Sequence, residues 1–258
     1  MKLGVALAGG AFKGICHVGA LEVLEKNQIK IDMISGCSMG AVVGGLYAAG
    51  VSIETLKKEL NDLKRGKLMD FYPKALRNLG LMSGDKIIRY LKGLCGDILI
   101  EDCKIPFVAT AVDIVSGKTV YLDKGPLLDA IRASISIPGL FAAVKKDDML
   151  LVDGGVKERI PVNILKEKGM DRTLAINTST DPGVMHPKNM VMMLSRAFDL
   201  MDWESCRRGC FCEADYTVPM EKGCEIVYYK PSEALKAYQM GFDAMTEHLE
   251  GARQALGL

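Results

Sequence analysis

The stretch Gly36-Cys37-Ser38-Met39-Gly40 decides the fold, because it joins a short apolar segment to a helical pattern. We predict a strand over Asp32–Gly36 and a helix over Met39–Ala49, which Gly50 ends. The glycines allow a sharp turn, and the serine hydroxyl then lies at a helix N-terminus, where backbone N–H groups favour a developing negative charge. This context is typical of a nucleophile elbow. The alternative is a tight turn in which Ser38 only caps the helix.

Outward from this turn, short apolar segments alternate with helical patterns. Leu3–Ala8 is predicted to be a buried strand ending at Gly9-Gly10, and a helix follows from Gly14 to about Asn27. Strand, helix, strand, helix requires crossover connections, which predicts an α/β fold with a parallel sheet covered on both faces. Further strands are predicted at Pro106–Val112, Thr119–Leu122, Met149–Val152, Thr173–Asn177 and near Cys224–Tyr229, with helices after Ser52, Ser83, Pro126 and Pro161, around Met190–Met201 and at the C-terminus. The irregular stretch Lys64–Leu81 is the expected cap or lid over a site.

A second glycine-rich segment, Gly9-Gly10-Ala11-Phe12-Lys13-Gly14, lies between a predicted strand and a predicted helix. Backbone amides exposed at such a junction form an anion cradle. One interpretation is an oxyanion hole for an ester carbonyl. Another is a dinucleotide fingerprint completed by Asp32, although Ala11 replaces the second glycine and Asp32 begins its strand where the ribose-binding acid should end it. A turn required only for packing is the third.

A third segment, Asp153-Gly154-Gly155, follows the strand Met149–Val152. A carboxylate at the C-terminal end of a strand lies at the edge where open parallel sheets carry their sites. The glycines beside it permit close approach of a ligand or another backbone. Before it, the apolar segment Ala133–Phe141 bends at Pro138 and is either a wall for an acyl chain or part of the core.

Together these segments resemble the patatin-like phospholipase family in its bacterial, single-domain form. The resemblance runs from Leu3 to about Ile176, and we expect residues 1–258 to form one domain completed by residues 177–258. It implies a three-layer α/β/α sandwich around a mainly parallel sheet. It also implies a serine–aspartate dyad that hydrolyses lipid acyl esters, with Ser38 as nucleophile and Asp153 as general base.

The resemblance further implies that backbone amides stabilise the oxyanion, and that neighbouring motif residues support the site. The oxyanion amides belong to Gly9, Gly10 and Ala11, and the supporting residues are Lys13, Gly14, Gly36, Gly40, Gly154 and Gly155. The chain departs from the family pattern at Ala11, where a third glycine is usual, and at Phe12, where a small residue is usual. An alanine that needs positive φ would strain the loop.

The dyad explains why histidine is scarce: the chain has 3 histidines. His17 lies one turn into the helix after the glycine-rich segment and is expected to be packed, whereas His186 and His248 lie in the less motif-like C-terminal third. Aspartate is a poor base for a hydroxyl, since its ordinary pKa is about 3.9. Asp153 must therefore be partly desolvated and within hydrogen-bond reach of Ser38.

Composition limits the remaining function classes. The 258 residues carry a formal charge of +1, so no global field favours nucleic acid. A basic cluster is either a solvated face or a surface that makes transient contact with anionic lipid; it comprises Lys57, Lys58, Lys64, Arg65 and Lys67. Neither a signal peptide nor a transmembrane segment is evident, which predicts a cytoplasmic protein, peripheral at the membrane at most.

No metal or cofactor is expected. The eight cysteines are predicted to be free thiols, and the cluster Cys206, Cys210 and Cys212 lacks the two C-x-x-C arms of a zinc site. Cys37 points away from the tip of its turn and is expected to be buried. No EF-hand-like loop is present, which predicts calcium independence. Two other function classes stay open: a nucleotide-binding module or oxidoreductase that uses Gly9–Gly14, and a non-catalytic scaffold that binds lipid or a partner.

Overall fold

The computed structural model describes residues 1–62, 79–188, 190–207, 213–220 and 231–258. The predicted strand at Cys224–Tyr229 and most of the predicted cap at Lys64–Leu81 lie outside these residues. The described strands are β1 (Leu3–Leu7), β2 (Met33–Cys37), β3 (Gly80–Met82), β4 (Phe107–Asp113), β5 (Lys118–Leu122), β6 (Gly139–Phe141), β7 (Val144–Lys146), β8 (Met149–Asp153), β9 (Arg172–Asn177) and β10 (Tyr216–Pro219).

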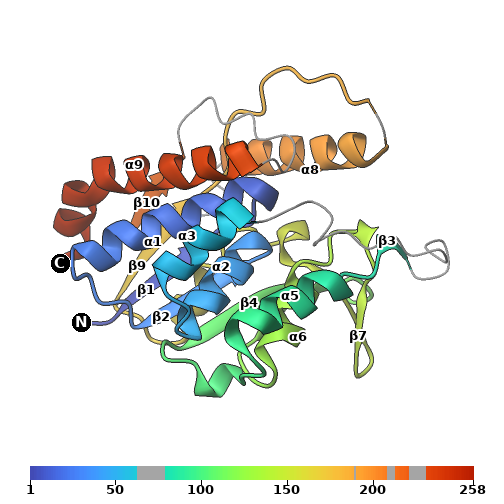
Figure 1. Cartoon of the computed structure of the whole chain (residues 1–258), viewed down its shortest axis with the longest axis horizontal. Helices are drawn as coiled ribbons and strands as arrows, with labels where there is room; N and C mark the ends of the chain where they lie inside the picture. Colours follow the sequence, from blue (N-terminus) through green and yellow to red (C-terminus); the bar gives the residue numbers. More distant parts are fainter. Residues whose placement is uncertain (63–78, 189, 208–212, 221–230) are drawn as a thin grey trace.

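From β1 to α2 strands and helices alternate, as the sequence predicts, whereas β4–β5 and β6–β8 follow one another without a helix. The α-helices are α1 (Cys16–Lys26), α2 (Met39–Ala48), α3 (Ile53–Asp62), α5 (Asp85–Cys95), α6 (Leu127–Ser134), α7 (Asn163–Glu167), α8 (Met190–Arg207) and α9 (Pro231–Leu256), and the 3-10 helices are η1 (Ala11–Ile15), η3 (Ile100–Asp102) and η4 (Gly154–Val156). In Figure 1, β1 runs away from the N-terminus and α1 returns toward it.

The eight-stranded sheet is parallel through its centre and antiparallel toward one edge. Its order is β10-β9-β1-β2-β4-β8-β7, with β5 paired to β4 beside this path. The pairs from β10 to β4 are parallel, whereas β5 and β8 pair antiparallel to β4, and β7 antiparallel to β8. The predicted α/β fold with a mainly parallel sheet is therefore confirmed. The separate pair β3–β6 was not predicted from the sequence, because three-residue strands leave no periodic pattern.

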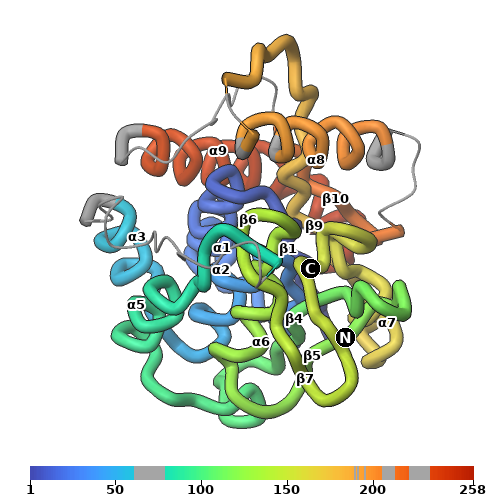
Figure 2. Tube along the Cα trace, turned by 90° about the vertical axis from the view of Figure 1, so that its right-hand side faces the viewer, coloured from blue at the N-terminus to red at the C-terminus, as the bar shows by residue number. Residues whose placement is uncertain are grey.

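Alternate side chains of the central strands point to two different cores. Leu3, Val5 and Leu7 of β1 belong to the larger core beneath α1, α2 and α9. Ala6 and the following Ala8 belong to a smaller core with residues of α7 and the segment before it. Small residues suit this second face, because α7 and the segment after it pack close to β1: a Cβ on Gly4 would lie 2.8 Å from Met170 Cγ. Helices thus cover both faces of the sheet, which gives the predicted three layers (Figures 1 and 2).

The predicted basic cluster is described only at its start. Lys57 lies 3.0 Å from Glu22 and 4.7 Å from the centre of the Tyr238 ring, so this lysine links α3 to α1 and α9. Lys58 is exposed. The other predicted members, Lys64, Arg65 and Lys67, lie outside the described residues. Among the described helices, none has both the length and the apolar character needed to cross a bilayer.

Candidate active site

Ser38 occupies the turn between β2 and α2 in a backbone conformation that few residues adopt, with φ 51° and ψ −120°. Close packing on both sides makes this turn possible. A Cβ on Gly36 would lie 2.5 Å from the Gly40 carbonyl oxygen, and a Cβ on Gly40 would lie 2.1 Å from the Leu7 carbonyl oxygen. The two glycines therefore let the start of α2 press against the end of β1. Strained backbone of this kind at a serine is typical of functional sites.

The backbone of Ser38 is fixed from α6. Its N–H donates to Ser134 Oγ at 2.9 Å, and Ser134 Oγ donates in turn to the Thr110 carbonyl oxygen at 2.7 Å. This chain of bonds ties the elbow (Gly36–Gly40) to both α6 and β4. The segment Ala133–Phe141 was expected to line an acyl site or to be core, and through Ser134 it also positions the elbow.

Asp153 reaches the level of Ser38 by a route that the sequence did not predict. We expected its carboxylate at the carboxyl end of a parallel strand, but β8 runs antiparallel to β4. Cys37, the last residue of β2, pairs with Thr110, whereas β4 continues to Asp113. The strand β8 returns along this extension, and Asp153 pairs with Ala111, the residue after Thr110. The structure therefore brings the alcohol and the acid together on either side of β4.

The Asp153 carboxyl is buried, and its surroundings shift its pKa in opposing directions. Oδ1 accepts the Gly155 N–H at 2.8 Å and lies 3.6 Å from Cys37 Sγ. Oδ2 is buried and has no partner of good hydrogen-bond geometry among the described residues. Burial raises the pKa of Asp153, and the Ser38 hydroxyl, the Gly155 amide and the Arg159 guanidinium pull it back only partly. A raised pKa suits a carboxylate that must accept a proton.

Cys37 is the buried thiol that we predicted. Its side chain is inaccessible to solvent, and burial together with the nearby Asp153 charge raises the pKa of the thiol well above its usual value. A protonated, buried thiol is a poor nucleophile. The other described cysteines, Cys16, Cys95 and Cys103, are likewise free thiols.

The Gly-rich loop (Gly9–Gly14) joins β1 to α1 and lies beside the elbow. A Cβ on Gly9 would lie 3.4 Å from Ser38 Cβ. The Gly9 amide is not available to an oxyanion, because it donates to the Arg159 carbonyl oxygen at 2.9 Å. The amides of Gly10 and Ala11 have no acceptor among the described residues. Ala11 has φ 45°, which lies in the left-handed region. A glycine, the usual residue of the family pattern at this position, would adopt this conformation without strain.

Two side chains bind the Gly-rich loop at Gly9, and a third, His17, binds Ala8 immediately before it. His17 Nε2 donates to the Ala8 carbonyl oxygen at 2.8 Å, and burial lowers the His17 pKa to about 4, so the ring is neutral and packed, as expected. Arg159 Nε donates to the Gly9 carbonyl oxygen at 2.8 Å, and Thr178 Oγ1 donates to the same oxygen. We did not predict Arg159 or Thr178. Their only sequence signal is position, soon after the Asp153 motif and directly after β9.

The remaining glycines of the predicted motifs allow close packing. A Cβ on Gly14 would lie 2.6 Å from Met39 Cβ, and one on Gly154 would lie 2.5 Å from the Thr110 carbonyl oxygen. A Cβ on Gly155 would lie 3.1 Å from Asp153 Oδ1. These glycines let the Gly-rich loop, the elbow and β8 approach one another. Lys13 Nζ lies 3.3 Å from Thr180 Oγ1, at the rim of the same region.

The structure does not favour the dinucleotide alternative. Asp32 Oδ2 accepts the Leu3 N–H at 2.9 Å, so its carboxylate holds the start of β1. The Gly-rich loop lies beyond the other end of that strand. An acid in this place cannot contact the ribose of a nucleotide whose phosphates lie on the loop.

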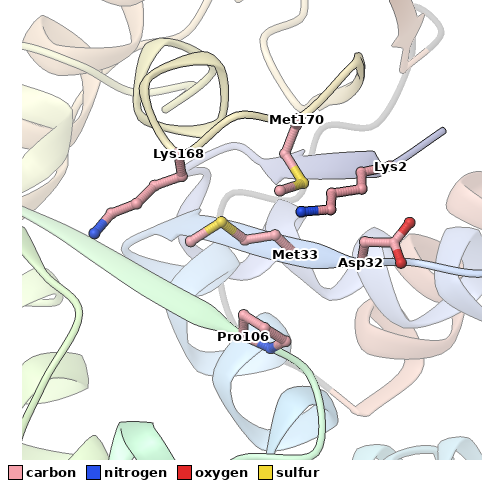
Figure 3. A pocket seen from close by; sticks show the side chains of 6 residues that line it. All are labelled: Lys2, Asp32, Met33, Pro106, Lys168 and Met170. Atoms are coloured by element: carbon pink, nitrogen blue, oxygen red, sulfur yellow. The ribbon is translucent and has the colours of Figure 1, made fainter.

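The amino end of the sheet carries a hollow of about 330 Å³ (Figure 3). The hollow is lined by Lys2, Asp32, Met33, Pro106, Lys168 and Met170. The methionines and the proline form its apolar part, and the lysines and the aspartate form its polar part. Since Ser38 lies at the carboxyl end of β2, this hollow is no part of the candidate site. Among the described residues, no group of three histidines, cysteines or acids could hold a metal ion. Cys210 and Cys212, and the side chain of Cys206, lie outside that description.

Comparison with known proteins identifies the family. The family model of patatin-like phospholipases matches residues 5–166, and the chain belongs to this family. An uncharacterized NTE family protein of Mycobacterium bovis is 34% identical over 176 residues, which cover 68% of this chain and 49% of the relative. The protein named lysophospholipase NTE1 of Candida albicans is 30% identical over 181 residues, 69% of this chain and 13% of the relative. The chain thus spans about half the length, or less, of these relatives.

Two solved structures share the fold. VipD of Legionella pneumophila superposes with a TM-score of 0.61 at 14% identity, over 97% of this chain and 66% of VipD. The type III effector protein ExoU superposes with a TM-score of 0.53 at 13% identity, over 97% of this chain and 53% of ExoU. Identities this low show a shared fold, and the match confirms the architecture predicted from the motifs.

Proposed function

We propose that the chain is a serine acyl-ester hydrolase that acts on lipids, with Ser38 as nucleophile and Asp153 as general base. The observation that carries the proposal is the burial of one alcohol and one acid side by side, next to the amides of Gly10 and Ala11, for which the described residues offer no acceptor. Family membership supports lipid ester hydrolysis. The family description supports phospholipids as substrates, and the name of the Candida albicans relative supports lysophospholipids; simpler esters are a third candidate.

The proposed reaction uses these groups in two steps. Asp153 accepts the Ser38 hydroxyl proton as the oxygen attacks the ester carbonyl carbon, and the carbonyl oxygen becomes an oxyanion that accepts the N–H groups of Gly10 and Ala11. Collapse expels the alcohol, which takes the proton from Asp153. A water molecule then gives its proton to Asp153 and attacks the acyl-enzyme. The fatty acid leaves and Ser38 recovers its proton.

A fluorophosphonate probe tests the nucleophile directly. Because this probe phosphonylates only activated serines, we expect one label on the wild-type protein, at Ser38, and none on Ser38→Ala. Ser35→Ala is the matched control, since Ser35 is a buried serine of β2, the strand before the turn, and its hydroxyl donates to the Pro161 carbonyl oxygen. Hydrolysis of p-nitrophenyl butyrate should follow the labelling. Labelling that persists in Ser38→Ala would exclude Ser38 as the nucleophile, whereas a wild-type protein without label and activity would favour the scaffold alternative.

We place the transient membrane contact on α8. Five exposed apolar residues of this helix lie within an arc of about 100° around its axis; they are Met190, Met193, Ala197, Leu200 and Met201. Asp202 lies on another face of the helix and is buried. The helix also borders the segment that leads from Ser134, because Leu194 Cδ1 would lie 3.3 Å from a Cβ on Gly139. An apolar stripe near the site favours a lipid surface as its partner.

Replacing two residues of this stripe should separate soluble from membrane-borne substrates. The double variant Met193→Ser/Leu200→Ser loses apolar area that would enter the lipid, and we expect about 10-fold slower hydrolysis of phosphatidylcholine in vesicles. Hydrolysis of p-nitrophenyl butyrate should not change. Leu235→Ser, on the half-exposed face of α9, is the control. Equal rates for the double variant and wild type on vesicles would refute the contact.

A further inference from the structure

We propose that Arg159 is a positioning residue that sets the Gly-rich loop for oxyanion binding, and that Asp202 on α8 holds Arg159 in place. The inference rests on the proposed function and assigns it a mechanism that neither the sequence motifs nor the family match contains. Arg159 lies between η4 and α7, six residues after Asp153. Asp202 is a buried residue of α8, and Figure 1 draws this helix toward the side of the molecule opposite the N-terminus.

Arg159 binds both peptide groups of Gly9. Its carbonyl oxygen accepts the Gly9 N–H at 2.9 Å, and its Nε donates to the Gly9 carbonyl oxygen at 2.8 Å. Thr178 Oγ1 donates to that carbonyl oxygen as well. Thr178 also explains the need for glycine at the next position, because a Cβ on Gly10 would lie 2.6 Å from Thr178 Oγ1. Gly9 is therefore held on both sides.

The two hydrogen bonds to the Gly9 carbonyl oxygen determine the direction in which the Gly10 N–H points. The Gly9 carbonyl and the Gly10 N–H belong to one planar trans peptide group, in which they point in opposite directions. With the carbonyl held against Arg159 and Thr178, the Gly10 N–H must point away from them, where no described residue accepts it. A cationic donor on the carbonyl also polarises the peptide group and strengthens its N–H as a donor. Arg159 thus aims and activates one oxyanion donor without contact with substrate.

Asp202 supplies the counter-charge that allows a buried guanidinium here. Arg159 Nη1 lies 3.1 Å from Asp202 Oδ2, and the two side chains are 11% and 7% exposed. Ser179 Oγ donates to the same carboxylate oxygen, so Asp202 is itself fixed from the segment after β9. Removal of one partner of a buried ion pair leaves an uncompensated charge and is strongly destabilising, whereas replacement of both partners is tolerated better. The double substitution should therefore restore the stability that a single substitution loses, but it should not restore the orientation of the loop.

The test uses Arg159→Gln, Asp202→Asn and the double variant, with Arg172→Gln as the control for loss of an arginine in an exposed ion pair. We expect Arg159→Gln to lower kcat for p-nitrophenyl butyrate roughly 10- to 100-fold with little change in KM. The affinity for a trifluoromethyl ketone, whose serine adduct carries an oxyanion, should fall by the same factor. The double variant should regain the Tm lost in Asp202→Asn but not the kcat.

The outcomes separate this inference from the proposed function. A double variant that regains kcat together with Tm would show that the pair is only structural, as would an Arg159→Gln protein with wild-type kcat and ketone affinity. In both cases wild-type hydrolysis, and its loss in Ser38→Ala, would leave the proposed function intact. If the wild-type protein hydrolyses no ester, both proposals fall together.

Discussion

Asp153→Asn is expected to lower kcat for ester hydrolysis by roughly 10²- to 10⁴-fold while raising the stability of the fold. Asparagine keeps the size of the side chain but cannot accept the Ser38 proton. It also removes a buried carboxylate whose ionised form is disfavoured by desolvation. Steady-state kinetics and thermal unfolding of the same preparations measure the two effects.

Asp113→Asn is the matched control for this substitution. Asp113 ends β4 and its carboxylate accepts N–H groups of Val115, Ser116 and Leu150. Its loss should lower Tm and leave kcat near the wild-type value, the reverse of the Asp153 result. An Asp153→Asn protein that keeps half of the wild-type kcat would exclude Asp153 as the base.

The same prediction has a pH dependence with a defined sign. Burial raises the folded-state pKa of Asp153 above its ordinary 3.8, against the opposing effects of Ser38, Gly155, Arg159 and Cys37. The acid limb of kcat/KM should therefore lie above that pH, since the base must be ionised. Because the folded state holds the proton more tightly than the unfolded state, the stability advantage of Asp153→Asn is full above the folded-state pKa. It should vanish as pH falls toward 3.8.

Gly40→Ala is expected to destabilise the fold by roughly 3 kcal/mol or more. Its Cβ would lie 2.1 Å from the Leu7 carbonyl oxygen and 2.7 Å from that of Ala8. These are backbone atoms at the end of a central strand, so they cannot move aside without disturbing β1 and the Gly-rich loop. Urea unfolding measures the change.

Gly93→Ala provides the comparison for Gly40→Ala. Gly93 also lies in an α-helix, α5, but nothing lies within 4 Å of its added Cβ. Alanine there should stabilise by up to about 1 kcal/mol through helix propensity. If both substitutions changed the free energy of unfolding by less than 0.5 kcal/mol, the close approach of α2 to β1 would be wrong.

Local features of the fold were predictable from the sequence because they depend on neighbouring residues. The strands β1 and β2, the helix α2 and the turn at Ser38 all follow from apolar runs and glycines within about twenty residues. Partners across the sheet were not predictable, since periodicity does not encode which strand a segment joins or in which direction. The pairing of Asp153 with Ser38 came from the family resemblance, and the antiparallel direction of the strand that carries Asp153 was not foreseen.

Contacts that join distant segments lay beyond sequence reasoning for the same reason. Arg159 contacts Gly9 across 150 residues, and Thr178 contacts it across 169. Neither residue carries a local pattern that indicates this contact. The strand Tyr216–Pro219 was missed because four residues, one of them proline, do not form an apolar run, and β-sheet hydrogen bonds to β9 select them instead.

The antiparallel return of β8 along β4 has a consequence for protein synthesis. Cys37 and Asp153 are 116 positions apart, so a ribosome completes the elbow long before it adds the acid. The residues that bind Gly9, Arg159 and Thr178, come later still, as does Asp202, which pairs with Arg159. On the proposed mechanism, a half-made chain holds an alcohol with no base to activate it. On this mechanism, hydrolysis of lipids around the ribosome should begin only after the second half of the chain has been made and has folded.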